Sequence, residues 1–287
     1  MIDPLPGASD PATINLVDRA AGAASVHIRP LRSMEDCHAC VALQRHVWGW
    51  DQADVVPATL LHVVEYVGGL AAGAFDADGI MLGFVFGISG VRAGHLAHWS
   101  HMLGVRESAR NIGLGRMLKE YQRTTLAALG IGQIYWSFDP LMTKNAYFNL
   151  NRLGAEVVDY VPDMYGTTES PLHLGMPTDR LVVCLETASS RRRSLSHSSI
   201  NDGLPILSPF PRQSDDAMTV GDRTPDHALI EIPADVLDLV ARTPAIAHVW
   251  RLAVRENLRW ALERGYRISG VHVTATGRSF YAIIRAA

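Results

Sequence analysis

The sequence predicts a mixed α/β fold, with one main sheet of strands and helices followed by a small C-terminal β-α-β-β unit. Three observations predict it. Short apolar runs alternate with stretches of helical period along residues 26–187. A glycine-containing loop joins one strand-like run to an amphipathic helix at residues 110–116. With 287 residues, 48% of them hydrophobic, the chain can form one good core and a second, smaller one.

Before residue 106 we expect one strand, two helices and three further strands. In order, these are strand Val26 to Leu31, helix Met34 to Val47, helix Thr59 to Tyr66, and strands Leu70 to Phe75, Ile80 to Ile88 and Leu96 to Val105. Ser33 is a suitable N-cap for the first helix. Asp76-Ala-Asp-Gly79 is typical of a turn. We therefore expect a hairpin around that turn.

The period becomes helical after residue 112. One helical face collects the apolar residues Leu114, Met117, Leu118, Tyr121 and Leu129, together with Thr125, and Gly130 stands where a C-cap belongs. The remaining predicted elements are strand Gln133 to Phe138, helix Leu141 to Leu153 closed by Gly154, and strands Glu156 to Val161 and Arg180 to Glu186. The order predicts a mixed sheet.

Two segments lack apolar periodicity. Residues 1–25 are therefore predicted to be a disordered tail, and residues 188–226, rich in Ser, Arg, Pro and Asp, a linker. The main domain would span residues 26–187, and an accessory unit residues 227–287. A unit of about 60 residues has a thin core, so we expect it to pack on the main domain or on a second subunit.

Four elements are predicted in this accessory unit: strand Leu229 to Ile232, helix Ala247 to Glu263, and strands Tyr266 to Val273 and Ser279 to Ile284. Arg251, Arg255 and Arg259 lie opposite the apolar face of the helix. We expect this basic stripe to face solvent, with contact to a second subunit or binding of a ligand phosphate as the alternative.

Charge and composition favour a small ligand. A net charge of -3 and a pI near 6.4 give no general attraction to nucleic acid or to membrane surfaces. Neither a secretory signal nor a stretch long enough to span a membrane is visible, and the cysteines Cys37, Cys40 and Cys184 form no disulfide framework. We therefore expect a cytoplasmic protein. Cys37-His-Ala-Cys40 lacks a second ligand pair, so no metal is predicted.

The segment Arg110-Asn-Ile-Gly113-Leu-Gly115 is the feature most suggestive of chemistry. Its glycines allow a tight turn and leave successive N–H groups open at the positive end of a helix dipole, which suits phosphate. A dinucleotide-binding turn would need a third glycine at Leu118. A nucleoside-triphosphate loop would need Gly-Lys-Ser/Thr, but Arg116 follows Gly115. An ordinary loop remains the alternative.

Placed after the strand Trp99-Ser-His-Met-Leu-Gly-Val105, the motif Arg110-x-x-Gly113-x-Gly115 resembles motif A of the GNAT superfamily of N-acetyltransferases. In that family the motif holds the pyrophosphate of acetyl-CoA. The order of elements from Val26 to Glu186 is also similar to the GNAT fold. The resemblance implies an acyl-CoA N-acyltransferase fold that uses acetyl-CoA or another acyl-CoA as co-substrate and needs no metal.

Other segments resemble a bacterial branch of predicted GNAT acetyltransferases. They are Trp136-Ser-Phe-Asp139-Pro140, Asn145-Ala-Tyr-Phe148-Asn149, Leu153-Gly154-Ala155, Pro177-Thr-Asp179-Arg180 and, in the C-terminal part, Ile232-Pro-Ala-Asp235 and Trp250-Arg251. Some members of this branch are associated with N-acylation of amino acids by succinyl-CoA. The resemblance therefore leaves the acyl group open.

The resemblance also implies how the cofactor is held. In that family the strand before motif A splays from its neighbour and its backbone pairs with the pantetheine arm. The residues placed beside the arm would be Leu103, Gly104 and Val105, and the amides that hold the phosphates would be those of Asn111, Ile112, Gly113, Leu114, Gly115 and Arg116. Arg110 and Arg116 would add charge, or be ordinary surface cations.

Two asparagines are further candidates for binding the arm. Asn145 and Asn149 lie four apart on a predicted helix and share a face, which suits hydrogen bonds to pantetheine amides. A polar helix surface is the alternative interpretation.

Acyl transfer from a thioester to an amine needs a base for the amine proton and an acid for the departing thiolate. The candidate bases are His98 and His101, which lie on the strand expected to line the acceptor pocket, with side chains on opposite faces. Each could instead be a structural histidine. Asp139, at the carboxyl end of a strand, could bind a substrate ammonium group or cap the next helix.

The acid is less evident. Many family members have a tyrosine four residues before the helix-ending glycine, but here the position before Gly154 holds Leu150. Tyr147 and Tyr165 are candidate replacements, although a tyrosine in such a place can be a packing residue.

The leading hypothesis is an enzyme that transfers an acetyl, succinyl or other acyl group from acyl-CoA to the amine of a small molecule, such as an amino acid, in a direct ternary complex. Leu150 motivates the alternative, a non-catalytic acyl-CoA-binding regulatory module. Acylation of a protein lysine would call for an acidic peptide groove, which no acidic run supports. The acceptor and the oligomeric state, including a homodimer, stay open.

Overall fold

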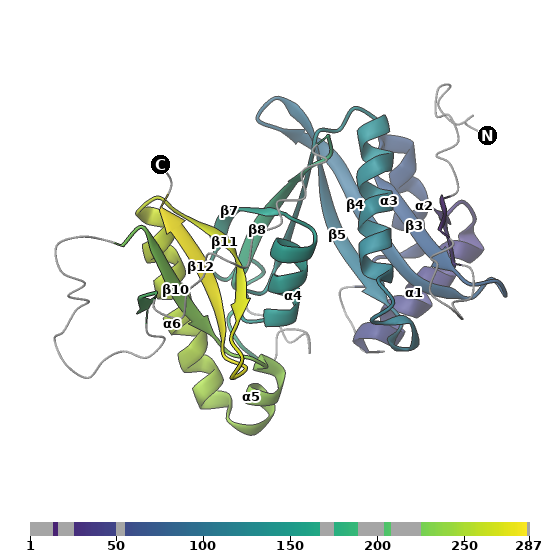
Figure 1. The fold of residues 1–287 in the computed structure, drawn as a ribbon. Coiled ribbons are helices and arrows are strands. Elements are labelled where there is room, and N and C mark those ends of the chain that lie inside the picture. Colours follow the sequence, from purple (N-terminus) through teal and green to yellow (C-terminus); the bar gives the residue numbers. More distant parts are fainter. Residues whose placement is uncertain are drawn as a thin grey trace. The chain divides into compact units, whose positions relative to one another are not determined.

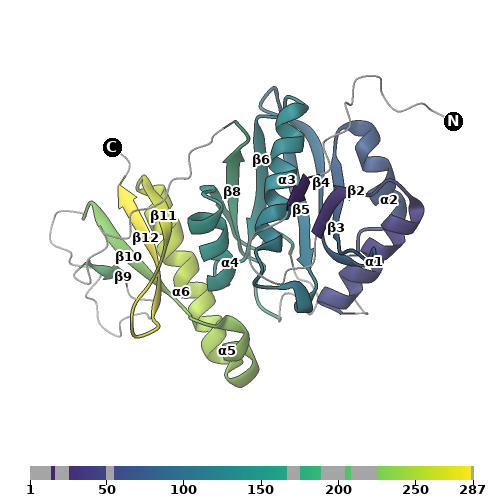
Figure 2. The same ribbon diagram turned by 45° about the vertical axis from the view of Figure 1, so that its right-hand side comes forward.

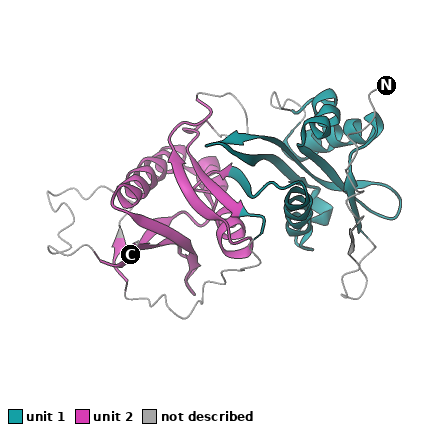
Figure 3. Ribbon diagram, turned by 90° about the horizontal axis from the view of Figure 1, so that it is seen from above, with its two compact units in different colours: residues 1–136, 170–172, 186–189 teal, residues 137–169, 173–185, 190–287 magenta. Residues whose placement is uncertain are grey.

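The computed structural model describes residues 14–16, 26–49, 55–166, 175–188, 204–207 and 225–285. Contacts divide the chain into two compact units (Figure 3). Unit 1 comprises residues 1–136, 170–172 and 186–189, and unit 2 comprises residues 137–169, 173–185 and 190–287. Among the helices of the described residues, none has the length and apolar character needed to cross a membrane.

Unit 1 is a sheet covered by helices on both faces (Figures 1 and 2). Its strands are β1 (Ile14–Leu16), β2 (Val26–Pro30), β3 (Leu70–Phe75), β4 (Met81–Arg92), β5 (His95–Val105) and β6 (Gln133–Phe138), the last of which runs into unit 2. Its helices are α1 (Met34–Trp48), α2 (Ala58–Val63) and α3 (Leu114–Ala128), with 3-10 turns η1 (Val64–Val67) and η2 (Glu107–Ala109). Pairing from β1 to β5 is antiparallel, whereas β5 and β6 are parallel, so the sheet is mixed as predicted.

Alternation along β4 builds a core on each face of this sheet. Phe84 and Phe86 pack in the cluster that contains residues of α1 and α2. Val85, between them, packs in the cluster that contains Leu118 and Tyr121 of α3. The sheet is therefore buried on both faces, which explains the nearly continuous apolar runs of β3 and β4.

The predicted start of α1 is confirmed. The Ser33 hydroxyl accepts a hydrogen bond from the Asp36 N–H at 3.1 Å, which satisfies one of the free amides of the first turn. The Asp36 carboxylate also binds the Arg29 guanidinium of β2, with N–O distances of 2.7 and 2.8 Å. Hydrogen bonding to Arg29 holds the pKa of Asp36 below its usual value.

Unit 2 contains a strand pair and a second sheet. The paired strands are β7 (Glu156–Val161) and β8 (Arg180–Glu186), and they follow α4 (Thr143–Tyr147) and the π-helical turn η3 (Phe148–Arg152). The second sheet has the order β11-β12-β10-β9 and is formed by β9 (Ile206–Leu207), β10 (His227–Ile232), β11 (Tyr266–Val273) and β12 (Ser279–Arg285). Helices α5 (Val236–Arg242) and α6 (Pro244–Glu263) lie between β10 and β11 in the chain.

The C-terminal elements pack against residues 140–151 of the same unit. Asn151 exchanges two hydrogen bonds with the Val271 backbone, at 3.0 and 2.9 Å. The Tyr281 hydroxyl donates to the Pro140 carbonyl at 2.7 Å, and the Thr143 hydroxyl donates to the Pro233 carbonyl at 2.6 Å. This is one of the two arrangements expected for a unit with a thin core.

Some elements were not predicted. Residues 14–16, in the predicted tail, form β1, and Ile206–Leu207, in the predicted linker, form β9; most other residues of these two segments lie outside the described ranges. Strands of two or three residues are too short to show a period. Helix α5 was also missed, although Asp235 caps it by accepting from the N–H groups of Leu237 and Asp238 at 3.0 and 3.2 Å. The predicted domain boundaries stay a prediction.

Candidate functional site

The loop between η2 and α3, residues 110–116, has the backbone that its glycines suggest. Gly113 is the N-cap of α3 with φ of 86°, and Asn111 has φ of 67°. A Cβ built on Gly113 would meet no heavy atom within 4 Å. Glycine is therefore needed at this position for the left-handed backbone and not for space. We call residues 110–116 the cofactor loop.

The cofactor loop presents a run of free N–H groups. The N–H groups of Arg116 and Met117 both donate to the Gly113 carbonyl, at 3.0 and 3.1 Å. Those of residues 111–115, by contrast, donate to no acceptor among the described residues. Residues 111–113 are exposed. The sequence predicted that the amides of residues 111–116 bind phosphate. Because the Arg116 N–H is already hydrogen-bonded, the amides that can do so are those of residues 111–115, at the positive end of α3.

The strand that precedes the loop offers backbone groups on one edge. The Arg106 N–H donates to the Leu82 carbonyl of β4 at 2.8 Å. Because N–H and C=O groups of successive strand residues point to opposite edges, those of Leu103 and Val105 point away from β4, while those of Gly104 point toward it. A Cβ on Gly104 would lie 2.6 Å from a ring carbon of Phe84. Gly104 is thus a packing residue.

Strands β5 and β6 are paired over only three residue pairs among the described residues. The last pair is Trp99 with Tyr135, and we call the point beyond it the fork. After the fork, Leu103 and Val105 have no strand partner in the described chain on the edge away from β4. An open strand edge and the free amides of the cofactor loop are therefore separated by only one short turn, η2. A long ligand with amide groups at one end and phosphates at the other matches this sequence of donors.

A β-bulge lies just past the fork. Phe86 of β4 is opposite Met102, and Gly87 is opposite Ser100, so His101 is the extra residue of β5. The exposed His101 ring packs edge-on against Phe86, with 6.1 Å between ring centroids. Phe86 belongs to the α1 and α2 core. His101 therefore lies on that face of the sheet.

His98 lies on the opposite face, as predicted, and is fully buried. Its Nδ1 is 2.9 Å from the Ser89 hydroxyl and its Nε2 is 3.1 Å from the Gln122 side-chain nitrogen. The Ser89 hydroxyl donates its one proton to the Gly68 carbonyl at 2.6 Å, so it must accept from His98 Nδ1–H. Nε2 is then free to accept from Gln122. Burial lowers the pKa of His98 to about 3, with the nearby Lys119 acting in the same direction. His98 is a neutral side chain with both ring nitrogens occupied.

Residues not predicted from the sequence complete this chain of hydrogen bonds. Gln122 Oε1 accepts from Lys119 Nζ at 3.1 Å, and Lys119 also donates to the Ser100 hydroxyl at 2.7 Å. Lys119 and Gln122 lie beside the apolar stripe of α3, three residues apart. Nothing in the pattern of the sequence distinguishes them from surface residues of an amphipathic helix.

The Asp139 carboxylate is bound by residues of unit 2, to which Asp139 itself belongs. Its carboxylate accepts two hydrogen bonds from the Arg251 guanidinium, at 2.8 and 2.5 Å, and one from the Leu141 N–H at 2.8 Å. Arg180 lies 3.8 Å away. Helix α4 begins at Thr143 with Met142 as its N-cap and no side-chain cap, so Asp139 does not cap it, and the ammonium-binding role of Asp139 stays a prediction.

The expectation of a solvated basic stripe on α6 was wrong for two of its three members. Arg251 is 1% exposed. Arg255 binds the buried Asp179, which also accepts from the Tyr160 hydroxyl, and it reaches Asp163 at 3.2 Å. These arginines bind carboxylates that follow β6, follow β7 or precede β8, and the helical pattern alone could not indicate such partners.

The other candidates in unit 2 lie on or after α4. Asn145 is exposed and Asn149 is buried, in the π-helical turn. Tyr147 is half-buried, with the Arg152 guanidinium 5.6 Å from its ring. Tyr165 is exposed and its hydroxyl is 3.2 Å from that of Ser137.

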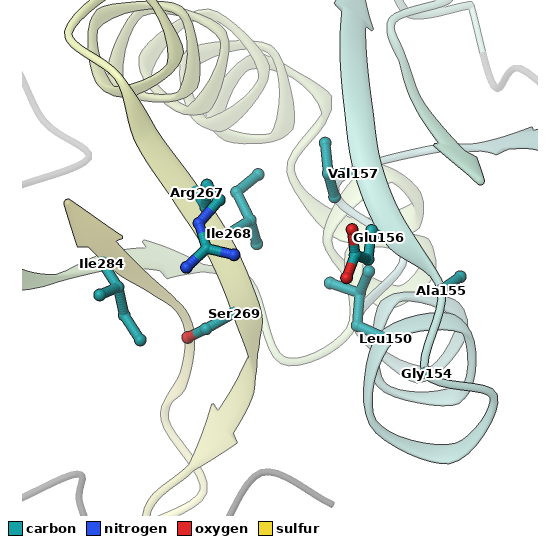
Figure 4. A pocket seen from close by; sticks show the side chains of 9 residues that line it. All are labelled: Leu150, Gly154, Ala155, Glu156, Val157, Arg267, Ile268, Ser269 and Ile284. Atoms are coloured by element: carbon teal, nitrogen blue, oxygen red, sulfur yellow. The ribbon is translucent and has the colours of Figure 1, made fainter. Parts of the chain in front are cut away.

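Leu150, the residue at the expected acid position, is buried and lines a cavity of about 210 Å³ in unit 2 (Figure 4). The other lining residues are Gly154, Ala155, Glu156, Val157, Arg267, Ile268, Ser269 and Ile284. The cavity is lined by none of the candidate catalytic residues. Within the described ranges, no cluster of three or more His, Cys, Asp or Glu side chains is arranged to hold a metal ion.

No family model matches this chain, and no curated protein matches it. The chain is similar to solved acetyltransferases. One is a GNAT-family acetyltransferase from Streptococcus pneumoniae, at 15% identity and a TM-score of 0.45, with 56% of this chain and 99% of that chain covered. A second is the ribosomal-protein-S18-alanine N-acetyltransferase from Escherichia coli, at 17% identity, TM-score 0.45, and coverage of 58% and 97%. A third is an aminoglycoside 6'-N-acetyltransferase complexed with coenzyme A, at 17% identity, TM-score 0.43, and coverage of 57% and 98%.

Proposed function

We propose that this chain is an acyl-CoA-dependent N-acyltransferase that acts on the amine of a small molecule in a direct ternary complex. The observation that carries the proposal is the succession of an open strand edge and free loop amides along one stretch of unit 1. The edge is formed by Leu103 and Val105, and the amides are those of residues 111–115.

Coenzyme A has the groups that this stretch would bind. Its pantetheine arm carries two amides, which can pair with a strand edge as a peptide does. Its phosphates suit amides at a helix N-terminus. Arg110 and Arg116 are exposed beside these amides and would add positive charge. Acyl-CoA, as co-substrate, would supply an activated thioester.

Among the candidate bases we favour His101. Transfer requires that the amine lose a proton, and the acceptor of that proton must be accessible. His101 is exposed at the bulge of β5, whereas His98 is enclosed between Ser89 and Gln122. On this proposal His98 is structural. Tyr147 stays a candidate acid for the thiolate, because Leu150 has no proton to donate.

The acyl group and the acceptor are proposed only as classes. Acetyl and succinyl are the leading acyl groups, and an amino acid is the leading acceptor. A cytoplasmic location is proposed because the three cysteines form no disulfide framework, which suits a reducing compartment.

The first experiment is thermal unfolding of the purified protein with CoA, acetyl-CoA, succinyl-CoA or NAD. A ligand that binds only the folded state raises the melting temperature by mass action. We expect a shift with CoA species and none with NAD. A shift with NAD alone would mean that the loop binds a dinucleotide. No change of melting temperature with any of the four ligands would contradict cofactor binding.

One observation favours a second function, a non-catalytic acyl-CoA-binding module. The position expected to hold the acid is occupied by Leu150, which is buried and apolar. Turnover with a panel of amines separates the two functions. For an enzyme, His101→Gln should lower kcat at least tenfold while CoA affinity stays within about twofold; a binding module would show no turnover in either protein.

A further inference from the structure

Lys119 is an unusual residue in this chain. The sequence contains only two lysines, Lys119 and Lys144, against 24 arginines. Lys144 is exposed, whereas Lys119 is only 5% exposed. A buried ammonium group is expensive unless it is well partnered, and no carboxylate among the described residues pairs with it. Burial lowers its pKa to about 7.

The contacts of Lys119 join two strands. Its Nζ donates to the Ser100 hydroxyl of β5 at 2.7 Å and lies 4.0 Å from the centre of the Trp136 ring of β6. Ser100 and Trp136 each follow directly the last paired residues of their strands, Trp99 and Tyr135. The ammonium therefore occupies the fork, in contact with the first residue of each strand beyond the last β5–β6 pair.

The partners of Lys119 keep the ammonium in one place. Gln122 Oε1 accepts from it at 3.1 Å, and Gln122 is itself held by the neutral His98. Of the groups that face Lys119, β5 supplies Ser100 and the titratable His98, β6 supplies Trp136, and α3 supplies Gln122. Because the pKa of His98 is about 3, Lys119 is the group in this cluster that changes charge near neutral pH.

We propose that Lys119 is a positioning residue for cofactor binding: its ammonium ties Ser100 to Trp136 and so sets the opening between β5 and β6 at the fork. The inference rests on the proposed function, because the strand edge past the fork is where the pantetheine arm would pair. The cation attracts the face of the Trp136 ring while it donates to Ser100, and a neutral or apolar side chain cannot do both.

A positioning role for Lys119 predicts that its substitution changes CoA binding without lowering the stability of the protein. Lys119→Met removes the cost of burying an ammonium group that has no carboxylate partner, which offsets the loss of its hydrogen bonds to Ser100 and Gln122, so the melting temperature should not fall. The same change frees Ser100 and Trp136 from each other. A residue with a purely structural role would lose stability and binding together, or would leave binding unchanged.

The test measures CoA binding by isothermal titration calorimetry at pH 6.5 to wild type, Lys119→Met and Lys144→Met. We expect Lys119→Met to bind CoA about tenfold more weakly with an unchanged or higher melting temperature, and Lys144→Met to match wild type. Equal affinity of Lys119→Met and wild type would overturn the inference while leaving the proposed function standing. Failure of wild type to bind CoA would overturn both.

A second measurement needs no variant. In protein labelled with ¹³C only at lysine, the two Cε resonances can be followed against pH and against CoA. We expect one resonance, from Lys119, to titrate near pH 7 and to shift when CoA is added, while that of Lys144 does not shift. A Lys119 resonance that is unaffected by saturating CoA would contradict the inference even if Lys119→Met did not fold.

Discussion

Gly87 of β4 leaves the space that the His98 ring of β5 occupies. A Cβ built on Gly87 would lie 2.2 Å from His98 Nε2 and 2.5 Å from the Trp99 carbonyl oxygen. The ring cannot move aside easily, because Ser89 holds one nitrogen and Gln122 the other. The glycine and the orientation of the histidine therefore depend on each other.

Gly87→Ala should consequently destabilise the protein. The added methyl group must displace either the imidazole or the β5 backbone, and overpacking of this kind costs about 1–3 kcal/mol. Gly90→Ala, on the same strand, is the matched control, since a Cβ there would meet nothing within 4 Å. Urea unfolding of both variants measures the difference. Equal midpoints would show that the space at Gly87 is not restricted.

His98 should make stability depend on acid pH. Its pKa is about 3 in the folded protein and about 6.5 when unfolded, so between these values the unfolded chain binds a proton that the folded chain does not. The contribution of His98 to the free energy of unfolding should therefore rise with pH across this window, by up to about 1.4 kcal/mol per pH unit. This contribution should be constant above the window.

Substitution isolates this contribution. His98→Gln should flatten the pH dependence between pH 4 and 6.5 relative to wild type, whereas His38→Gln, at an exposed position of α1, should not. The measurement is the urea midpoint at a series of pH values. Parallel curves for wild type and His98→Gln would mean that folding does not lower the pKa of His98.

Gly113→Ala should weaken CoA binding. Gly113 has φ of 86° and open space around it, so alanine there meets no steric contact but strains the backbone by about 1–2 kcal/mol. Relief of that strain would turn the N–H groups of the cofactor loop. Gly130, just past the other end of α3, has φ of 75° and the same open space.

Gly130→Ala is therefore the control. Both variants should lose similar stability, but only Gly113→Ala should lose CoA affinity, by about tenfold or more. Thermal unfolding in the presence and absence of CoA gives both quantities. If the two variants bound CoA alike, the cofactor loop would have no part in binding.

The sequence predicted the elements that have a long and regular period. The strand and helix limits of α1, α3 and β5 agree with prediction to within one or two residues. For α3 the reason is a regular apolar face that packs in a core. The bulge at His101 and the short pairing of β5 with β6 could not be predicted. Both depend on which residues of neighbouring strands lie opposite each other, and an isolated strand pattern carries no register.

The sequence also did not predict which polar residues are buried. Lys119, Gln122 and Arg251 all lie in amphipathic helices, where polar residues are ordinarily taken to face solvent. Each is buried because its partner is supplied by a distant segment: Ser100 for Lys119, His98 for Gln122, and Asp139 for Arg251. Such pairs join residues far apart in the chain, so the periodicity of one helix cannot predict them.

The pair formed by Arg251 and Asp139 should stabilise unit 2. Arg251 is 1% exposed and donates two hydrogen bonds to the Asp139 carboxylate. Removing one partner of a buried pair leaves an uncompensated charge, which costs about 3–5 kcal/mol. Arg251→Ala should therefore lower the free energy of unfolding by an amount in this range, toward the lower end because the Asp139 side chain is 22% exposed.

Arg259→Ala is the control for this variant. Arg259 lies on the same helix but is exposed, and its contact with Glu263 is 3.4 Å long, so its removal should change stability by less than about 0.5 kcal/mol. A double-mutant cycle with Asp139→Asn measures the coupling directly by chemical denaturation. If Arg251→Ala and Arg259→Ala were equally mild, the ion pair of Arg251 with Asp139 would contribute no net stability to unit 2.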